Sequence, residues 1–202
     1  MIGIVDYGMG NLRSVEKAFQ GMGFPVTVTS DPSVLQQVSG MVIPGVGAFP
    51  DAMDHLTRRR LIEPIMAHVE KGKPLLGICL GMQVLFQEGY EGEKRQGLGI
   101  LPGQVVKIPP GRKIPHMGWN RLTLLQDCPV LKGVPSGSYV YFVHSYFVDN
   151  LDAGHLAALT DYGLMLPAVV QKDRIFGLQF HPEKSSDTGL QMIKNFGELS
   201  QC

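Results

Sequence analysis

The stretch of sequence that decides the fold spans residues 74–86 and reads PLLGICLGMQVLF. The apolar residues before Gly77 predict a buried strand, and those after Gly81 predict a helix. The two glycines allow a very tight turn around Cys79, because side chains here would clash and glycine tolerates a strained backbone. A strand, a sharp turn and a helix are typical of a nucleophile elbow, here with cysteine in place of serine.

The elbow interpretation gives Cys79 a defined chemical environment. It places the thiol at the carboxyl end of a strand and at the amino end of a helix, where backbone N–H groups and the helix dipole favour the thiolate. A free cysteine is also often a small, buried apolar residue. This segment alone leaves both interpretations open.

A second polar motif follows an apolar run near the C-terminus. Residues 175–180 predict a buried strand, and His181 and Glu183 stand where it ends. A cysteine nucleophile needs a general base, and the base needs a carboxylate that fixes its tautomer and stabilises the imidazolium. A histidine at a strand end is by itself usually a polar cap. Combined with the elbow, the motif predicts a catalytic triad of Cys79, His181 and Glu183.

The first half of the chain alternates predicted strands with predicted helices. This order implies right-handed crossovers and a mostly parallel sheet flanked by helices. Active sites of such sheets lie at the carboxyl ends of the strands, where Cys79 stands. The predicted strands span residues 2–6, 25–29, 41–43 and 74–79, and the predicted helices lie within residues 12–22, after Asp31-Pro32, and within residues 51–70 with a break near Arg60.

The second half is rich in short β-type stretches, prolines and glycines between residues 97 and 173, which predicts an antiparallel extension of the sheet. Residues 188–199 predict a closing helix. Because no repeat, low-complexity segment or linker divides the chain, we expect a single α/β domain over residues 1–202. The strands expected in this half span residues 105–108, 139–147, 155–160 and 168–171.

The composition narrows the classes of function. Eighteen basic and eighteen acidic residues give no net charge, which argues against a nucleic-acid-binding protein. No apolar run has transmembrane length, and the N-terminus lacks a signal-peptide pattern. The three cysteines have neither disulfide-framework nor zinc-site spacing, and the histidines show no metal-ligand pattern. We therefore expect a cytoplasmic protein with no metal or other cofactor, in which Cys128 and Cys202 have no function.

The elbow and the His-x-Glu motif together resemble the triad-type, class I glutamine amidotransferases. Four further segments resemble one branch of that family, the glutaminase subunit of imidazole glycerol phosphate synthase. The resemblance runs from residue 2 to about residue 196, nearly the whole chain. The segments read GICLGMQ (77–83), QFHPE (179–183), IGIVDYGMGNL (2–12), PGVGAF (44–49), PHMGWN (115–120) and YFVHSY (141–146).

The resemblance implies roles for further residues. Backbone N–H groups of Val46 and Leu80 would form an oxyanion hole, and His144 would have no catalytic role. Trp119 is expected to face a partner, although packing in the core explains a tryptophan equally well from sequence alone. The substrate-binding residues implied are Gly47, Gln83, Glu91, Ser145 and Tyr146. The partner-facing residues implied are Trp119, Asn120, Tyr141 and Lys184.

The resemblance also implies an activity. Cys79 would hydrolyse L-glutamine to glutamate and ammonia through a thioester, within the lyase complex that serves histidine biosynthesis. The sequence carries no phosphate loop or nucleotide fingerprint, which indicates that the ammonia is delivered to a partner synthase. The resemblance implies that this partner is a (β/α)8 cyclase subunit in a heterodimer, to which the ammonia is channelled. Two alternatives stay open: a glutaminase of an anthranilate- or aminodeoxychorismate-type synthase, and a γ-glutamyl or cysteine hydrolase. Lys184 and residues 115–120 favour the glutaminase that feeds the cyclase over both alternatives. No membrane or nucleic-acid partner is expected.

Overall fold

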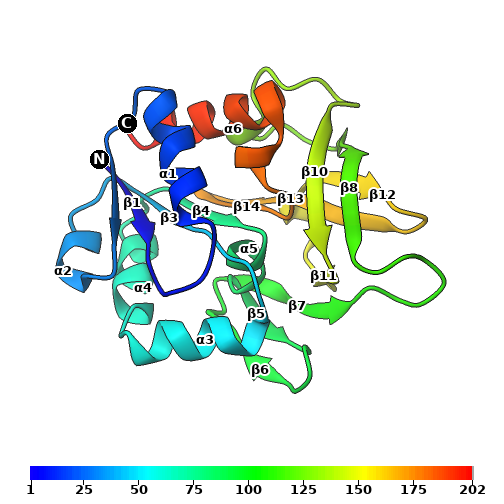
Figure 1. The fold of residues 1–202 in the computed structure, drawn as a ribbon, viewed down its shortest axis with the longest axis horizontal. Coiled ribbons are helices and arrows are strands. Elements are labelled where there is room, and N and C mark those ends of the chain that lie inside the picture. Colours follow the sequence, from blue (N-terminus) through cyan, green and yellow to red (C-terminus); the bar gives the residue numbers. More distant parts are fainter. Residues whose placement is uncertain (202) are drawn as a thin grey trace.

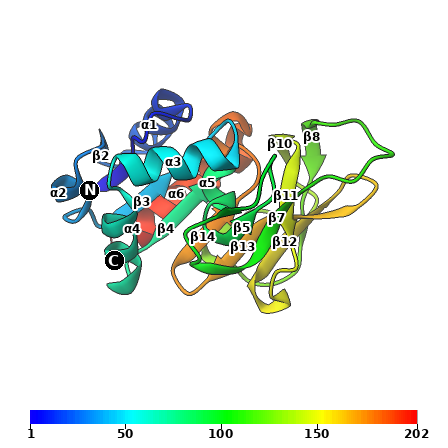
Figure 2. The ribbon, with the colours of Figure 1, turned by 90° about the horizontal axis from the view of Figure 1, so that it is seen from below.

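A computed structural model describes residues 1–201 and has an eight-stranded sheet at its centre (Figures 1 and 2). Its strands span Ile2–Val5 (β1), Val26–Thr29 (β2), Gly40–Ile43 (β3), Leu75–Ile78 (β4), Thr123–Leu124 (β9), Leu156–Asp161 (β12), Met165–Lys172 (β13) and Ile175–Leu178 (β14). Five run parallel in the order β2-β1-β3-β4-β14, and the antiparallel strands β13, β12 and β9 extend one edge. The predicted α/β class is confirmed.

Helices cover both faces of the parallel part of the sheet (Figure 1). One face carries α1 (Leu12–Gly21) and α6 (Ser186–Leu199), and the other carries α3 (Phe49–Arg58) and α4 (Ile62–Glu70). Successive strand residues point to opposite faces, so Ile4 joins the core under α1 and α6 while Val5 joins the core under α3 and α4. Two apolar cores thus fix the sheet and leave its carboxyl edge for a site.

Short-range signals set several of the helix boundaries as predicted. Asp31 caps the short helix α2 (Pro32–Leu35), because its Oδ1 accepts a hydrogen bond of 2.8 Å from the Ser33 amide. Arg60 separates α3 from α4 with a left-handed φ of 56°, which matches the expected break. The expected closing helix is α6.

Two smaller sheets complete the fold, and the sequence did not predict them as separate. One is a hairpin of β8 (His116–Arg121) and β10 (Tyr139–His144). The other contains β11 (Tyr146–Asp149), β7 (Leu101–Lys107), β5 (Phe86–Gly89) and β6 (Arg95–Gln96). The short 3-10 turns η1 (Pro129–Leu131) and η2 (Ala153–His155) lie in the connections.

Two boundaries predicted from the sequence were wrong. The helix after the elbow, α5 (Leu80–Gln83), is a single turn, because Phe86 already begins β5 and pairs with β7. The strand expected over residues 139–147 is two strands that part at Ser145. β10 pairs with β8 and β11 pairs with β7, so the chain passes from one sheet into another at this residue.

Candidate active site

Cys79 stands at the end of β4 in the strained backbone that an elbow requires. Its φ of 54° and ψ of −111° lie where residues other than glycine are rare. Its amide donates to the Leu178 carbonyl of β14 at 2.7 Å, and its carbonyl accepts from the Gln83 amide of α5 at 3.1 Å. Strand and helix therefore fix the thiol position from both sides.

The glycines around Cys79 are required by close backbone contacts. A Cβ at Gly77 would lie 2.5 Å from the Gly81 carbonyl oxygen. A Cβ at Gly81 would overlap the Ile43 carbonyl oxygen at the end of β3. Close contacts with neighbouring backbone therefore require glycine at both positions, as the sequence indicated. The helix dipole favours the thiolate less than expected, because α5 is a single turn and has little macrodipole.

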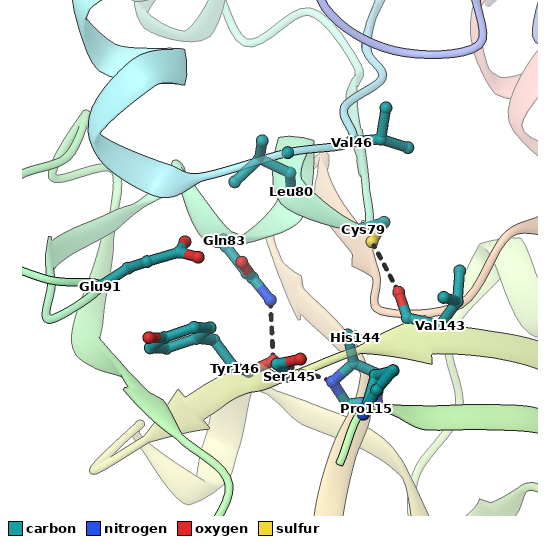
Figure 3. A pocket seen from close by; sticks show the side chains of 11 residues that line it. Val46, Cys79, Leu80, Gln83, Glu91, Pro115, Val143, His144, Ser145 and Tyr146 are labelled. Carbon is teal, nitrogen blue, oxygen red and sulfur yellow. Dashed lines mark hydrogen bonds between the residues drawn. The ribbon is translucent and has the colours of Figure 1, made fainter.

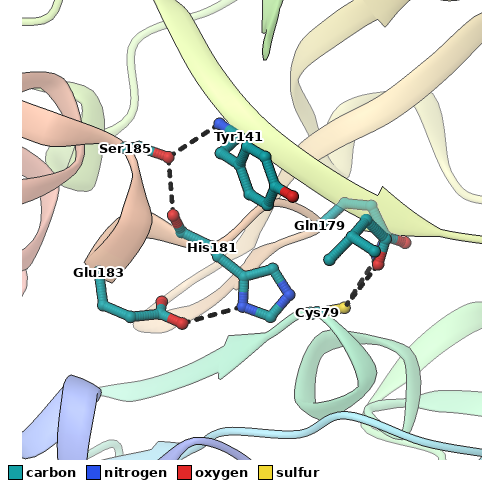
Figure 4. A network of polar contacts seen from close by, with 7 residues as sticks. Cys79, Tyr141, Gln179, His181, Glu183 and Ser185 are labelled. Carbon is teal, nitrogen blue, oxygen red and sulfur yellow. Dashed lines mark hydrogen bonds and ion pairs between the residues drawn. The ribbon is translucent and has the colours of Figure 1, made fainter. Parts of the chain in front are cut away.

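His181 and Glu183 lie beside Cys79 after β14 (Figure 4). His181 Nδ1 and Glu183 Oε1 are 2.9 Å apart, and the two side chains are only 3% and 1% exposed. A carboxylate only accepts, so Nδ1 carries the proton and Nε2 keeps its lone pair. Nε2 has no hydrogen-bond partner among the described residues and points toward the Cys79 sulfur. The structure therefore brings the three predicted residues into the order sulfur, imidazole, carboxylate.

The turn that carries Glu183 is tied to the hairpin. Glu183 lies in the 3-10 turn η3 (Pro182–Lys184). Ser185 Oγ donates to the His181 carbonyl at 2.7 Å and accepts from the Tyr141 amide at 2.9 Å. These two bonds hold the base and its carboxylate against β10.

The environment of His181 makes it a strong base. Burial by itself would lower its pKa, but the neighbouring Cys79 sulfur and the Glu183 carboxylate outweigh burial and raise the pKa to about 9. At neutral pH the imidazole therefore holds a proton firmly. That preference favours transfer of the proton from the thiol and an ion pair with the sulfur.

A cavity of about 340 Å³ opens at Cys79 (Figure 3). Its wall contains the cysteine, both oxyanion-hole candidates and all five substrate-binding candidates from the sequence. His181 and Glu183 are absent from the wall and approach the sulfur from beside it. The lining residues are Val46, Gly47, Cys79, Leu80, Gln83, Glu91, Pro115, Val143, His144, Ser145 and Tyr146.

Gln83, which lines this cavity, forms a buried amide pair with Gln179. Gln83 Nε2 donates to the Tyr146 carbonyl at 2.9 Å and to Gln179 Oε1 at 3.0 Å. Gln179 Nε2 in turn lies 3.8 Å from the Cys79 sulfur. The sequence analysis missed Gln179, although a polar residue at the end of an apolar strand was a usable signal.

The loop after β3 and the start of α5 supply the two oxyanion-hole candidates, Val46 and Leu80. The Val46 and Leu80 amides donate no hydrogen bond to another residue of the part described, so both N–H groups are free for a ligand. Gly47 has a φ of 112°, which suits glycine. The buried Tyr7 hydroxyl donates to the Pro44 carbonyl at 2.7 Å and anchors the start of the loop. No local pattern in the sequence predicts this contact.

Glu91 lines the cavity, and one of its carboxylate oxygens has a structural partner. Oε2 accepts from the Phe49 amide, the first residue of α3, at 2.8 Å. The Glu91 carboxylate and the Tyr146 phenol lie on the same side of the cavity (Figure 3), and burial, with Glu91 nearby, raises the pKa of Tyr146. Glu91 thus ties the loop after β5 to the start of α3.

The partner-facing candidates are gathered on the β8–β10 hairpin and η3. Trp119 is 51% exposed, which rules out the core interpretation, and its ring meets that of Tyr141 edge to face at 6.1 Å. Lys184 is exposed. The Asn120 side chain turns inward instead, because its Nδ2 donates to the Asp161 carbonyl at 2.9 Å.

Residues 1–201 show the surroundings of the other cysteines and histidines. Within this range no cluster of three or more histidine, cysteine, aspartate or glutamate residues could hold a metal ion. Cys128 is buried, and burial raises its pKa to about 11. Cys202 lies outside the described residues. No helix in the described range is both long and apolar enough for a membrane span.

Comparison with known proteins places this geometry in a sequence family. Residues 3–198 match the family model described as glutamine amidotransferase class-I. A curated relative from Caldanaerobacter subterraneus subsp. tengcongensis, named imidazole glycerol phosphate synthase subunit HisH, is 54% identical over 202 residues and covers 100% of both chains. The relative of the same name from Aquifex aeolicus is 48% identical, over 96% of this chain and 94% of its own.

Solved structures share the fold at low sequence identity. The structure described as a glutamine amidotransferase superimposes with a TM-score of 0.79 at 22% identity, over 100% of this chain and 99% of the other. The PurLQS structure from Thermotoga maritima gives 0.77 at 20% identity, over 96% of each chain. At this identity the likeness concerns the fold alone.

Proposed function

Since the chain belongs to the class-I glutamine amidotransferase family, within the branch of imidazole glycerol phosphate synthase subunit HisH, we propose that Cys79 hydrolyses glutamine and that the ammonia passes to a separate cyclase subunit. The observation that carries the proposal is the buried line from the Cys79 sulfur through His181 to Glu183. The names of the relatives favour this branch over the other synthase and hydrolase readings.

The first chemical step uses the base and the sulfur. His181 Nε2 takes the thiol proton, and the Cys79 sulfur attacks the side-chain amide carbon of glutamine. The carbonyl oxygen becomes an oxyanion, which the free Val46 and Leu80 amides stabilise. When the tetrahedral intermediate collapses, the C–N bond breaks and the imidazolium gives its proton to the departing ammonia.

The second step releases glutamate from the thioester. His181 takes a proton from water, the hydroxide attacks the thioester carbon, and the C–S bond breaks. The proton returns from His181 to the sulfur, so the triad is restored. Glu183 keeps the same His181 tautomer throughout, because its carboxylate holds Nδ1–H at 2.9 Å.

The cavity wall supplies recognition of the amino-acid end of glutamine. Gln83 is fixed by its two donated bonds, so its orientation is set before substrate enters. Glu91 offers a negative charge for the substrate ammonium, and the backbone at Gly47, Ser145 and Tyr146 offers polar groups for the carboxylate. Such a preformed site costs little ordering when the substrate binds.

The hairpin is the proposed docking face for the cyclase. Trp119 and Tyr141 are paired across β8 and β10, and the exposed Trp119 ring beside the half-buried Tyr141 ring suits an aromatic interface anchor. Lys184 adjoins them through η3, next to Glu183. The same β10 strand continues to Val143, whose carbonyl oxygen is 3.9 Å from the Cys79 sulfur. A partner on this face therefore lies close to the point where ammonia forms.

The experiment separates the two halves of the reaction. In the complex with the cyclase, Cys79→Ala should abolish synthesis that depends on glutamine and leave synthesis from ammonium salt intact, because the acceptor chemistry belongs to the partner. Cys128→Ala is the matched control and should leave both activities unchanged. Loss of both activities in a folded Cys79→Ala complex would refute the division of labour.

A further inference from the structure

Two buried histidines outside the triad have no role in the mechanism above. His116 of β8 and His144 of β10 are 2% and 6% exposed, and they face each other as register partners of the hairpin. His116 Nδ1 and His144 Nε2 are 2.9 Å apart. Two imidazole rings in direct contact inside a protein need a defined arrangement of protons, since two lone pairs or two N–H groups cannot face each other.

The hydrogen-bond partners of the two rings determine which of their nitrogen atoms carries a hydrogen. The Tyr146 carbonyl oxygen can only accept, so His144 Nδ1, 2.8 Å away, carries a hydrogen. In the neutral ring His144 Nε2 then accepts from His116 Nδ1–H. His116 Nε2 is left as an acceptor and meets Asn120 Nδ2 at 3.3 Å. The result is a one-way chain of donors from Asn120 through both rings to the Tyr146 carbonyl.

Neither histidine in this chain of hydrogen bonds can take up another proton without setting two N–H groups against each other. A charged His144 would set its Nε2–H against the His116 N–H. Burial lowers the pKa of His116 to about 4. Burial, and then the nearby His116 and His181, lower the pKa of His144 to about 3 despite its bond to Tyr146. Both rings therefore stay neutral while His181 carries the charge of the site.

Packing prevents the His116 ring from turning away. The ring is stacked between Phe142, at 4.6 Å between centroids, and Tyr162, at 4.0 Å. The Tyr162 hydroxyl donates to the Lys113 carbonyl at 3.0 Å, which holds that ring in turn. His116 is thus clamped in the one orientation that completes the chain.

The chain ends on the wall of the substrate cavity. The Tyr146 carbonyl that accepts from His144 also accepts from Gln83 at 2.9 Å. Ser145 stands between His144 and Tyr146 in the sequence. It lines the cavity and lies where β10 ends and β11 begins (Figure 3). The Ile108 amide donates to the Ser145 carbonyl at 2.9 Å, and the bonds from His144 and Gln83 hold the Tyr146 carbonyl on the other side of the junction. At the other end, Asn120 follows the exposed Trp119 on β8.

We propose that His116 and His144 are positioning residues, which hold the Ser145–Tyr146 segment and, through it, Gln83 in the arrangement that binds the amino-acid end of the substrate. The proposal rests on the proposed function. Among the described residues, neither ring hydrogen-bonds to the sulfur, the base or the carboxylate of the triad. Loss of the hydrogen bonds that run from Asn120 through both histidines to Tyr146 should therefore weaken substrate binding and leave the chemical step nearly unchanged.

His116→Phe tests the chain without removing the stacked ring. The phenyl group still fits between Phe142 and Tyr162, but it offers no donor to His144 and no acceptor to Asn120. In the complex with the cyclase, KM for glutamine should rise about tenfold, which is about 1.4 kcal/mol of binding, while kcat stays within about threefold. Calorimetry of glutamine with the Cys79→Ala and Cys79→Ala/His116→Phe complexes should show the same tenfold difference in Kd without any turnover.

His144 gives a second, matched pair of variants. In His144→Asn the side-chain amide stands near the position of Nδ1 and can still donate to the Tyr146 carbonyl, so KM should stay within about threefold of wild type. His144→Leu has similar volume and no donor, so KM should rise at least tenfold. If His116→Phe fails to fold, this pair decides the question.

The outcomes separate the two proposals. Unchanged glutamine affinity and KM in folded His116→Phe or His144→Leu complexes would overturn the positioning role. A fall in kcat with unchanged KM would overturn it as well. If the wild-type complex does not hydrolyse glutamine, the proposed function has failed, whereas an active wild type beside unaffected variants refutes only the inference about the histidine pair.

Discussion

Glu183→Gln is the substitution that tests most directly how the active site works. Glutamine has the shape of glutamate, and the Glu183 side chain is 1% exposed, so packing is retained while the charge is lost. The carboxylate oxygen is 2.9 Å from His181 Nδ1. The substituted amide can turn its NH2 group toward Nδ1. His181 would then carry its proton on Nε2, facing the sulfur, where it cannot accept the thiol proton.

The magnitude follows from the pKa of His181. Its rise from 6.5 to about 9 corresponds to roughly 3 kcal/mol of preference for the imidazolium, at about 1.4 kcal/mol per pKa unit. Cys79 and Glu183 supply it together against burial. If Glu183 supplies about half, kcat/KM falls on the order of tenfold from the lost charge alone. If the tautomer of His181 is inverted as well, kcat/KM falls by a total factor of between about 10² and 10⁴.

The pH dependence of kcat/KM is a second measurement that tests the effect of Glu183→Gln. The pKa of His181 is raised in the folded protein, so its proton is held at lower pH and is lost as the pH rises through about 9. The wild-type kcat/KM for glutamine should therefore decline on the alkaline side near pH 9. In Glu183→Gln this decline should begin at lower pH, because one of the two groups that raise the pKa is gone.

The assay is glutamine-dependent synthesis in the complex with the cyclase, measured beside synthesis from ammonium salt. Only the first should fall. Glu63→Gln, on the exposed first turn of α4, is the control and should change neither activity nor pH profile. An activity of Glu183→Gln within about threefold of wild type, with the alkaline decline in the same place, would refute the assigned role.

Two further substitutions test the elbow and the hairpin. Gly81→Ala should lower the free energy of unfolding by about 1–3 kcal/mol, because its Cβ would overlap the Ile43 carbonyl of a buried strand. Gly21→Ala, where nothing lies within 4 Å, should be neutral or stabilising in the same denaturant titration, and equal effects would contradict the steric account. Trp119→Ala should weaken binding of the cyclase about tenfold or more by calorimetric titration and change the melting temperature little. Leu125→Ala, of similar exposure at 49%, should leave that affinity unchanged, and a large loss of stability with normal affinity in Trp119→Ala would refute an interface role.

The sequence alone determined the elbow and the residues that stand opposite it. A tight turn at Cys79 depends on its near neighbours, and glycine at positions 77 and 81 is a local signal. The carboxyl ends of neighbouring parallel strands meet at one edge of a sheet. A histidine and a glutamate at the end of another strand could therefore be placed beside the cysteine before any coordinates, as β4 and β14 now show.

Only the tertiary structure decided what lies around that line of residues. The end of α5 after one turn, the parting of β10 from β11 at Ser145 and the exposure of Trp119 all depend on which distant segments pair with these strands. The contact of His116 with His144 spans 28 positions, and that of Tyr7 with Pro44 spans 37. Local patterns carry no information about such contacts, because side-chain neighbours of this kind are set by strand register and packing.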